Sequence, residues 1–361
     1  MKQLLILILI SFIGKNAFSQ NDKLKTDWLI VYYMPYDNNL SVYGEPIIKM
    51  IGDSLKSKKI IAAVQADFRD TLGMERYIIT EDSTYKTQIS NEYSASSDSY
   101  EQYLKWIIEK VIFNKLAIVF LDHGGKLDQV CLDEKPKYQF LKVDSLKQVF
   151  IKILGKNKID LLFLQVCSKG AIEPLYEFKD VAKYTLCSQI ELGAPNYYYH
   201  GLFSKLSQHF LQNGIEMANE IVNNERYDMY SSYTLIDNSK LDSLNTLFYN
   251  LINKIQEQTG VKLKSIPLSS YYFQEKYWDI ISFLENIDIY NYPEFDIQKK
   301  QLINFITTKL ILFHKINQKR DRMKTYSGLN ISAVNTEGGT KYNNLQFYKL
   351  LSPIRKLAIT K

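Results

Sequence analysis

A histidine and a cysteine each follow a short, strongly apolar run in this chain. His123 lies just beyond the run at residues 116–121, and Cys167 ends the run that begins at residue 159. A thiol is a good nucleophile only as the thiolate, and a neighbouring imidazole is the usual means of forming a thiolate at neutral pH. The sequence contains only four histidines and three cysteines. This placement therefore indicates a thiol–imidazole pair for nucleophilic catalysis.

Short apolar runs of this kind predict buried strands, and the segments between them predict helices. Strands that alternate with helices are typical of a parallel sheet covered on both faces. Reactive groups in such sheets collect beyond the carboxyl ends of the strands, where His123 and Cys167 are placed. The expected strands span residues 27–34, 59–67, 76–80, 83–89, 116–121, 159–166 and 184–189, and the expected helices span 43–57, 97–111, 144–154 and 170–178.

The pattern changes after residue 199. No internal repeat or low-complexity linker is visible, so we expect the C-terminal part to pack against the sheet. Amphipathic helices are expected over residues 201–223, 238–259 and 297–316, a polar loop over 124–138, and a late strand over 327–332. The predicted organisation is a signal peptide at 1–19, an α/β core at 20–200, and a mainly helical C-terminal part at 201–361 that completes the same fold.

The first 19 residues have the features of a secretory signal peptide. Lys2 supplies a positive start, residues 4–13 are apolar, and residues 17–19 form a small-x-small cleavage site before Gln20. An uncleaved N-terminal anchor is the alternative. No later run of about 18 apolar residues follows, so we expect no stable membrane insertion after signal removal. The sequence predicts an exported protein, periplasmic or extracellular.

The chain has a small positive net charge. Removal of residues 1–19 takes away Lys2 and Lys15 and no acid, which lowers the formal net charge from +6 to +4. A nucleic-acid partner would need a denser basic stripe with interleaved aromatic residues. We therefore expect no nucleic-acid binding.

Three cysteines in an exported protein leave at least one thiol unpaired. Cys131 and Cys187 could form a disulfide, but the sequence does not determine the pairing. No CxxC spacing exists, so zinc binding through thiolates is not supported. A free thiol in an oxidising compartment suggests a function for it, whereas the alternative is a buried, inert cysteine.

Five segments, in the same order along the chain, resemble the clostripain-like cysteine peptidases, which have a caspase-like fold. Each segment alone is a weak signal, and the order of all five is fairly specific. The resemblance implies a mainly parallel sheet with helices on both faces and a helical C-terminal part packed on it. The segments are residues 28–34 with Asp37 and Asn38, residues 120–124, residues 159–167 with Gly170 and Glu173, residues 186–189 with Tyr197 and Tyr199, and residues 327–332.

The resemblance implies a role for each residue of the thiol–imidazole pair. Cys167 would attack the scissile carbonyl, and His123 would protonate the leaving amine and then activate the deacylating water. Gly124 would offer its backbone N–H to the oxyanion. Taken singly, His123 could be structural and Cys167 inert, but their joint placement favours catalysis. Asp122 should point to the opposite face of the strand and be structural.

The chain departs from the family where the substrate cleft is expected. The family commonly has an aspartate two residues before the nucleophile, which attracts a basic substrate side chain, whereas this chain has Gln165. Preference for a basic residue before the scissile bond is therefore in doubt. Glu191 is a candidate substitute acid, or else a solvated loop carboxylate.

Two further departures lie close to the same cleft. The residues Ser188 and Gln189 are followed by Ile190, where the family has a glutamate. Residues 168–169, Ser-Lys, replace the apolar pair that usually follows the nucleophile. We expect Gln165, Ser188, Gln189 and Glu191 to bind substrate.

Many relatives are zymogens that are cut between the histidine and cysteine strands. Residues 133–139 are polar, and Lys137 is the better processing site because Lys135 precedes a proline; an ordinary surface loop is the alternative.

Some relatives need calcium, but no EF-hand spacing is present, so we expect no cofactor and leave calcium open. The predicted activity is a cysteine endopeptidase that acts on proteins or peptides. There are two alternatives. One is a catalytically degenerate homologue that only binds peptides, and the other is an acyltransferase or ligase that uses the same pair.

Overall fold

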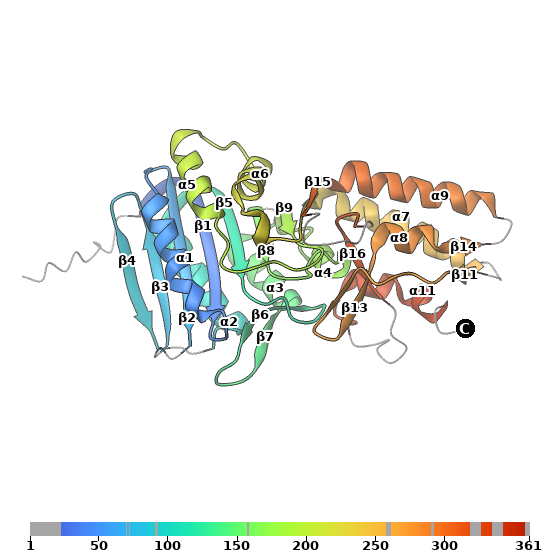
Figure 1. Cartoon of the computed structure of the whole chain (residues 1–361), viewed down its shortest axis with the longest axis horizontal. Helices are drawn as coiled ribbons and strands as arrows, with labels where there is room; N and C mark the ends of the chain where they lie inside the picture. Colours follow the sequence, from blue (N-terminus) through green and yellow to red (C-terminus); the bar gives the residue numbers. More distant parts are fainter. Residues whose placement is uncertain are drawn as a thin grey trace, which may run out of the picture.

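A nine-stranded sheet forms the centre of the molecule, with strand order β15-β10-β9-β8-β5-β1-β2-β3-β4 (Figure 1). The computed structural model describes residues 23–69, 71, 73–90, 93–156, 159–257, 261–289, 292–317, 326–333 and 342–357, so the predicted signal peptide lies outside the described residues. The parallel strands are β1 (Leu24–Tyr36), β2 (Ile60–Phe68), β5 (Val111–Leu121), β8 (Ile159–Gln165) and β9 (Ala182–Cys187). The antiparallel strands are β3 (Met74–Ile79), β4 (Thr84–Ile89), β10 (Ser232–Asp237) and β15 (Ile311–Ile316).

The central strands are buried on both faces because their side chains alternate between two hydrophobic cores. In β1, Val31 and Tyr33 lie in one core, and Ile30 and Tyr32 lie in the other. Helices α1 (Ser41–Ser54), α5 (Tyr198–Gln208) and α6 (Gly214–Asn224) complete the second core. Helices α2 (Ser97–Lys110), α3 (Val143–Leu154), α4 (Ile172–Glu177) and α7 (Leu241–Glu257) complete the first. The predicted α/β class, with helices on both faces of a mainly parallel sheet, is confirmed.

The C-terminal part contributes both to this sheet and to a second, smaller layer. β10 and β15 extend the main sheet beyond β9. A three-stranded sheet, β12-β13-β16, lies beside it and leads into the helices at the right of Figure 1. The remaining elements are β12 (Ser270–Tyr272), β13 (Glu275–Asp279), β16 (Asn330–Ser332), β11 (Val261–Leu263), β14 (Ile287–Ile289), α8 (Ile280–Glu285), α9 (Pro293–Phe305), α10 (Gln346–Leu350) and α11 (Ser352–Leu357).

Two predicted helices were wrong in their extent. Residues 201–223 fall into two helices, because the side-chain oxygen of Asn213 accepts from the backbone N–H groups of Ile215 and Glu216, each at 3.0 Å, and so starts α6 anew. In residues 297–316, α9 passes into a π-helical turn at Ile306–Leu310 and the chain then forms β15. Pairing with β10, a strand that was not predicted, decided that conformation.

The prediction of a loop over residues 124–138 was also wrong, because this range contains the first strand and the turn of a β-hairpin. β6 (Gln129–Asp133) pairs with β7 (Gln139–Lys142), and the backbone N–H of Cys131 donates to the carbonyl oxygen of His123 at 2.9 Å. The hairpin therefore supports the segment that carries the histidine. Its tip, residues 135–139, is exposed.

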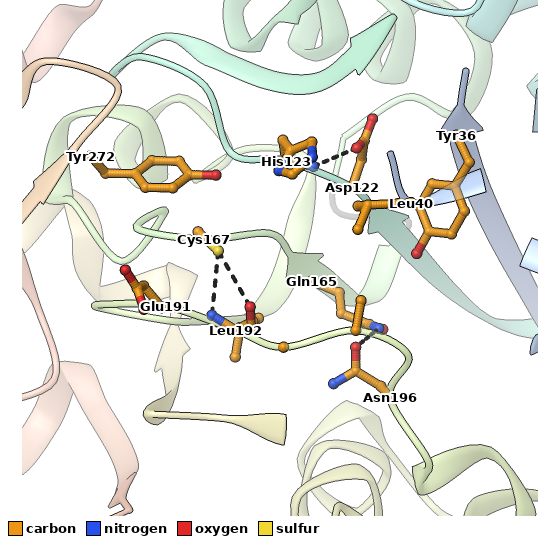
Figure 2. Close-up of a pocket in the computed structure, with 12 residues that line it drawn as sticks. Tyr36, Leu40, Asp122, His123, Gln165, Cys167, Glu191, Leu192, Asn196 and Tyr272 are labelled. Atoms are coloured by element: carbon orange, nitrogen blue, oxygen red, sulfur yellow. Dashed lines mark hydrogen bonds between the residues drawn. The ribbon is translucent and has the colours of Figure 1, made fainter. Parts of the chain in front are cut away.

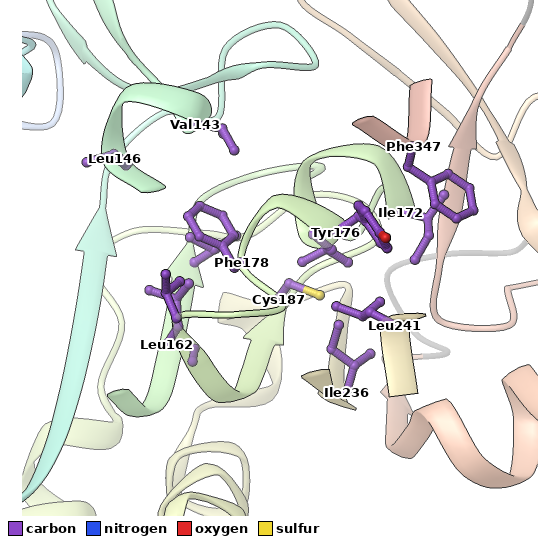
Figure 3. Close-up of a cluster of buried hydrophobic side chains, with 14 of the residues drawn as sticks. Val143, Leu146, Leu162, Ile172, Tyr176, Phe178, Cys187, Ile236, Leu241 and Phe347 are labelled. Carbon is purple, nitrogen blue, oxygen red and sulfur yellow. The ribbon is translucent and has the colours of Figure 1, made fainter. Parts of the chain in front are cut away.

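All three cysteines are free thiols. Cys131 is buried within β6 of the hairpin, and Cys187 lies in an apolar cluster with Leu162 and Phe178 (Figure 3). Burial raises the pKa of the Cys187 thiol well above its ordinary value. The structure therefore contains no Cys131–Cys187 disulfide.

None of the helices in the described ranges is long and apolar enough to cross a bilayer.

Candidate active site

Adjacent parallel strands bring His123 and Cys167 to the same edge of the sheet. Leu121 at the end of β5 pairs with Gln165 at the end of β8, and each reactive residue follows two positions later. Both side chains are half-buried and line one cavity of about 240 Å³. Figure 2 shows both residues at this cavity, with the sulfur of Cys167 directed toward the backbone of Leu192. The structure thus unites the two halves of the predicted pair.

Asn39 orients the imidazole of His123. Its amide oxygen lies 2.7 Å from Nε2 of His123, and an oxygen can only accept, so Nε2 carries the proton. The Nδ1 lone pair is then free to act as a base. Burial lowers the pKa of His123, which favours the neutral ring before substrate binds. Sequence reasoning placed the Asp-Asn turn here but did not assign a role to Asn39.

Asp122 supports the backbone, not the imidazole ring. Its carboxylate accepts from the backbone N–H of His123 at 2.6 Å, from the backbone N–H of Leu132 at 2.7 Å and from the Asn38 amide at 2.9 Å. Burial raises its pKa, and these donors oppose that rise. The expectation that Asp122 is structural agrees with these contacts. The expectation that it lies on the face opposite His123 was wrong, since both residues line one cavity.

A strained turn presents the thiol of Cys167. Ser168 has φ of +56°, an unfavourable backbone conformation for a residue with a side chain, and its N–H donates to the carbonyl of Ile190 at 2.8 Å. The backbone N–H of Leu192 lies 3.4 Å from Sγ of Cys167. Burial raises the pKa of the thiol, whereas the N–H of Leu192 and the hydroxyl of Tyr272 lower it. Both members of the pair are therefore biased toward their neutral forms in the substrate-free protein.

Gly124 lies against the backbone of the nucleophile. A Cβ atom built at this position would be 2.0 Å from the carbonyl oxygen of Cys167, so only glycine allows the approach. Its backbone N–H donates to the hydroxyl of Tyr272 at 3.4 Å. The predicted oxyanion donor therefore has a polar group beside it that a substrate oxygen would replace.

Tyr272 was not identified from the sequence. It ends β12, and a tight turn at Phe273 and Gln274, with φ of 48° and 65°, joins β12 to β13. The geometry brings a hydroxyl group from the C-terminal part to the cavity, where it accepts from the N–H of Gly124. Figure 2 shows Tyr272 on the same side of the cavity as Cys167. One tyrosine among 27 has no sequence signal that would mark it.

Substitution of Tyr272 by phenylalanine should raise the pKa of Cys167, because the hydroxyl favours the thiolate. We expect the pH profile of Cys167 alkylation by iodoacetamide to move upward by about one unit or less, so that alkylation on the acidic limb slows by up to about tenfold. Tyr271→Phe is the matched control, because Tyr271 is 61% exposed on the same hairpin. An unchanged profile in the Tyr272 variant would show that the hydroxyl does not act on the thiol.

Lys169 connects the segment that follows His123 to the turn that follows Cys167. Its side chain is fully buried, and Nζ donates to the carbonyl of Gly125 at 3.2 Å and to that of Lys126 at 2.7 Å. Burial lowers its pKa to about 7, and Asp128 opposes this shift. Lys169 therefore holds the segment after His123 against the turn after Cys167.

The four predicted substrate-binding residues separate into two groups. Gln165 and Glu191 line the cavity, with Gln165 buried and Glu191 exposed at its mouth. Ser188 and Gln189 are fully buried outside the cavity lining: the Ser188 hydroxyl donates to the Ile190 carbonyl at 3.1 Å, and the Gln189 amide donates to Asp279 at 2.8 Å. They hold the loop that forms the cavity wall. Besides Tyr272, the sequence did not single out six further lining residues, Tyr36, Leu40, Leu192, Gly193, Ala194 and Asn196.

Comparison with known proteins defines the class. The model of the clostripain family matches residues 32–346. The protein is a cysteine peptidase. It belongs to the clostripain family. No curated protein matches the chain. Within the described residues, no three histidine, cysteine, aspartate or glutamate side chains group so as to hold a metal ion.

Solved structures share the whole fold at low sequence identity. A secreted C11 cysteine protease from Bacteroides thetaiotaomicron, "iotapain", is 14% identical, with a TM-score of 0.70, over 90% of this chain and 99% of that chain. An inactive zymogen C11 protease from Parabacteroides distasonis is 16% identical, with a TM-score of 0.68, over 90% of this chain and 98% of that one. A secreted C11 protease from B. thetaiotaomicron with an irreversible peptide inhibitor is 14% identical, with a TM-score of 0.67, over 91% and 99%. The caspase-like arrangement of the sheet is thus common to all of them.

Proposed function

We propose that this protein is an exported endopeptidase that hydrolyses peptide bonds through an acyl-enzyme on Cys167, with His123 as its acid–base partner. The observation that carries the proposal is the convergence of three groups on one cavity. The thiol and the imidazole line it, and the backbone N–H of Gly124 donates to the hydroxyl of Tyr272, which lines it as well. These are the groups that acyl transfer to a thiol requires.

The proposed course follows from the placement of these groups. Nδ1 of His123 takes the thiol proton, and the thiolate of Cys167 attacks the scissile carbonyl. The carbonyl oxygen becomes an oxyanion that the N–H of Gly124 stabilises in place of the Tyr272 hydroxyl. The imidazolium then protonates the leaving amine, which leaves a thioester. His123 finally takes a proton from water, and the hydroxide formed adds to the thioester carbonyl. The C–S bond then breaks to release the acid product, and the imidazolium returns its proton to the Cys167 thiolate.

Cleavage at Lys137 would accompany activation. Lys137 lies at the exposed tip of the β6–β7 hairpin, where a second protease molecule can reach it. Asp133, at the base of that tip, is buried and accepts from the N–H of Ser94 at 2.9 Å, so a cut at the tip leaves the strand pairing in place. The fold neighbour from Parabacteroides distasonis is described as an inactive zymogen, which is consistent with activation by processing here.

Export and independence from a cofactor complete the proposal. The small-x-small site at residues 17–19 precedes the first described residue, and a fold neighbour is described as secreted. The proposed chemistry uses a thiol, an imidazole and a backbone amide, so it requires no metal ion. Cleavage should therefore be the same with calcium and with a chelator.

The direct test is labelling by a peptide that carries a thiol-reactive group, with mass spectrometry to locate the label. We expect the label on Cys167 alone, because Cys131 and Cys187 are fully buried. Labelling should depend on pH and be accompanied by hydrolysis of a mixed peptide library. Peptide binding without labelling or hydrolysis would instead identify a peptide-binding module, and a product joined to an added amine would identify an acyltransferase.

A further inference from the structure

Two amides form the polar floor of the active-site cavity. Gln165 lies two residues before Cys167, and Asn196 comes from the loop that follows β9. Both side chains are buried, at 5% and 2% exposure. Their amides contact each other, with Nε2 of Gln165 donating to Oδ1 of Asn196 at 2.5 Å (Figure 2). The orientation of these amides decides what the floor offers to a substrate.

A buried carboxylate behind the floor sets that orientation. Glu225, just after α6, accepts from Nδ2 of Asn196 at 2.8 Å and from the backbone N–H groups of Tyr197 and Arg226 at 2.9 Å each. A carboxylate can only accept, so the NH₂ group of Asn196 must face Glu225 and its oxygen must face Gln165. Burial raises the pKa of Glu225, and these N–H donors oppose the rise.

The orientation of Asn196 then determines that of Gln165. Nε2 of Gln165 donates to Asn196 and to the hydroxyl of Tyr199 at 3.2 Å, and its Oε1 accepts from the hydroxyl of Tyr198 at 2.8 Å. The second Nδ2 proton of Asn196 faces the hydroxyl of Tyr233 at 3.4 Å. All four amide protons are therefore in use. What remains on these two side chains is a lone pair on each amide oxygen, so the two amides can accept a hydrogen bond and cannot donate one.

The carboxylates near the floor do not offer a partner to a buried cation. Glu225 is separated from the cavity by Asn196 and already accepts from several N–H donors. Both oxygens of Asp122 accept from N–H donors as well. Glu191 is exposed at the mouth, where water screens its charge. Burial of a charged side chain without a partner is costly, and an anionic one would also meet the amide lone pairs.

We propose that this cavity takes, as the substrate residue before the scissile bond, an uncharged side chain that ends in a hydrogen-bond donor. Glutamine suits a cavity of about 240 Å³ with two acceptors at its floor. Glu225 is a positioning residue that acts through Asn196. The proposal rests on the proposed peptidase function and deepens it by naming the substrate class.

Peptides that differ only at this residue test the proposal on the wild-type protein. Glutamine and glutamate have nearly the same shape, so their ratio of kcat/KM isolates the hydrogen-bonding character of the floor. We expect glutamine to exceed glutamate by about 100-fold, because a site built for one polarity leaves the wrong isostere unpaired. We also expect lysine not to exceed glutamine. Equal cleavage after glutamine and glutamate, or lysine preferred by about tenfold or more, would overturn the proposal.

A Glu225→Gln variant tests the positioning role. A glutamine can donate or accept, so Asn196 and Gln165 would no longer be held in one orientation. The glutamine-to-glutamate ratio should fall by about tenfold or more, while alkylation of Cys167 by iodoacetamide stays at the wild-type rate. A retained ratio in a folded variant would refute the role of Glu225. Glu257→Gln, a change at an exposed carboxylate of α7, is the matched control and should leave the ratio unchanged.

The same measurements separate this inference from the proposed function. If no peptide is cleaved and Cys167 is not labelled by the thiol-reactive peptide, the peptidase function itself fails. If Cys167 is labelled and peptides are cleaved, but with no discrimination between glutamine and glutamate, only the inference fails. A Glu225 variant that does not fold leaves the wild-type peptide series as the deciding measurement.

Discussion

Replacement of Cys167 by alanine is expected to lower kcat for peptide hydrolysis by about 10⁵-fold or more, since nucleophile and base act as a unit and loss of either removes covalent catalysis. No other cysteine can substitute: Cys131 and Cys187 have no exposed surface, and both thiols have raised pKa values because they are buried. Labelling by the thiol-reactive peptide should disappear in the same variant. Rates of hydrolysis and intact mass after labelling are the measurements.

Stability and processing provide the controls for the Cys167 variant. The side chain is half-buried and its loss removes only a weak contact with Leu192, so thermal unfolding should change little. If the cut at Lys137 is made by the protein itself, the Cys167→Ala chain should stay in one piece while the wild type yields two. Hydrolysis that persists in the variant would place the chemistry elsewhere in the chain.

The sequence was sufficient to predict how the sheet positions His123 and Cys167. Apolar runs at residues 116–121 and 159–166 form adjacent parallel strands, and a register in which Leu121 pairs with Gln165 puts His123 and Cys167 at the same edge. Buried strands have strong patterns because both faces must be apolar. That pattern indicates where each strand ends, and the strand ends determine where the site lies.

Other parts of the site depend on contacts between residues distant in sequence. Tyr272 reaches Gly124 across 148 positions, and the contact arises from a hairpin whose placement no local pattern encodes. Glu225 acts on Gln165 only through Asn196, and each of the three is an ordinary polar residue when viewed alone. The segment that forms β15 likewise has a helical pattern that pairing with β10 overrides. Local sequence propensity predicts neither which residues contact one another in these cases nor which strands pair.

The change of Gly124 to alanine should be the second most damaging single substitution of the site. The added Cβ would lie 2.0 Å from the carbonyl oxygen and 3.0 Å from the carbonyl carbon of Cys167, and these are backbone atoms that cannot rotate away. Either the N–H of Gly124 or the turn that carries the thiol must then move. Loss of one oxyanion donor lowers kcat by about 10²–10³-fold, and the overpacking destabilises the fold by about 1–3 kcal/mol. Steady-state kinetics and thermal unfolding measure the two effects.

Gly155→Ala separates the effect on catalysis from the effect on stability. Gly155 ends α3 with φ of +78° and has open space where a Cβ would lie, so an alanine there is strained but touches nothing near the cavity. It should reduce stability by about 1–3 kcal/mol, the cost of a backbone conformation that is essentially reserved for glycine, and leave kcat unchanged. A Gly124 variant that lost stability to the same extent but kept its kcat would show that the N–H of Gly124 does not stabilise the oxyanion. A loss of kcat in the Gly124 variant alone would mean that the close approach of this residue to Cys167 is required for the chemistry itself.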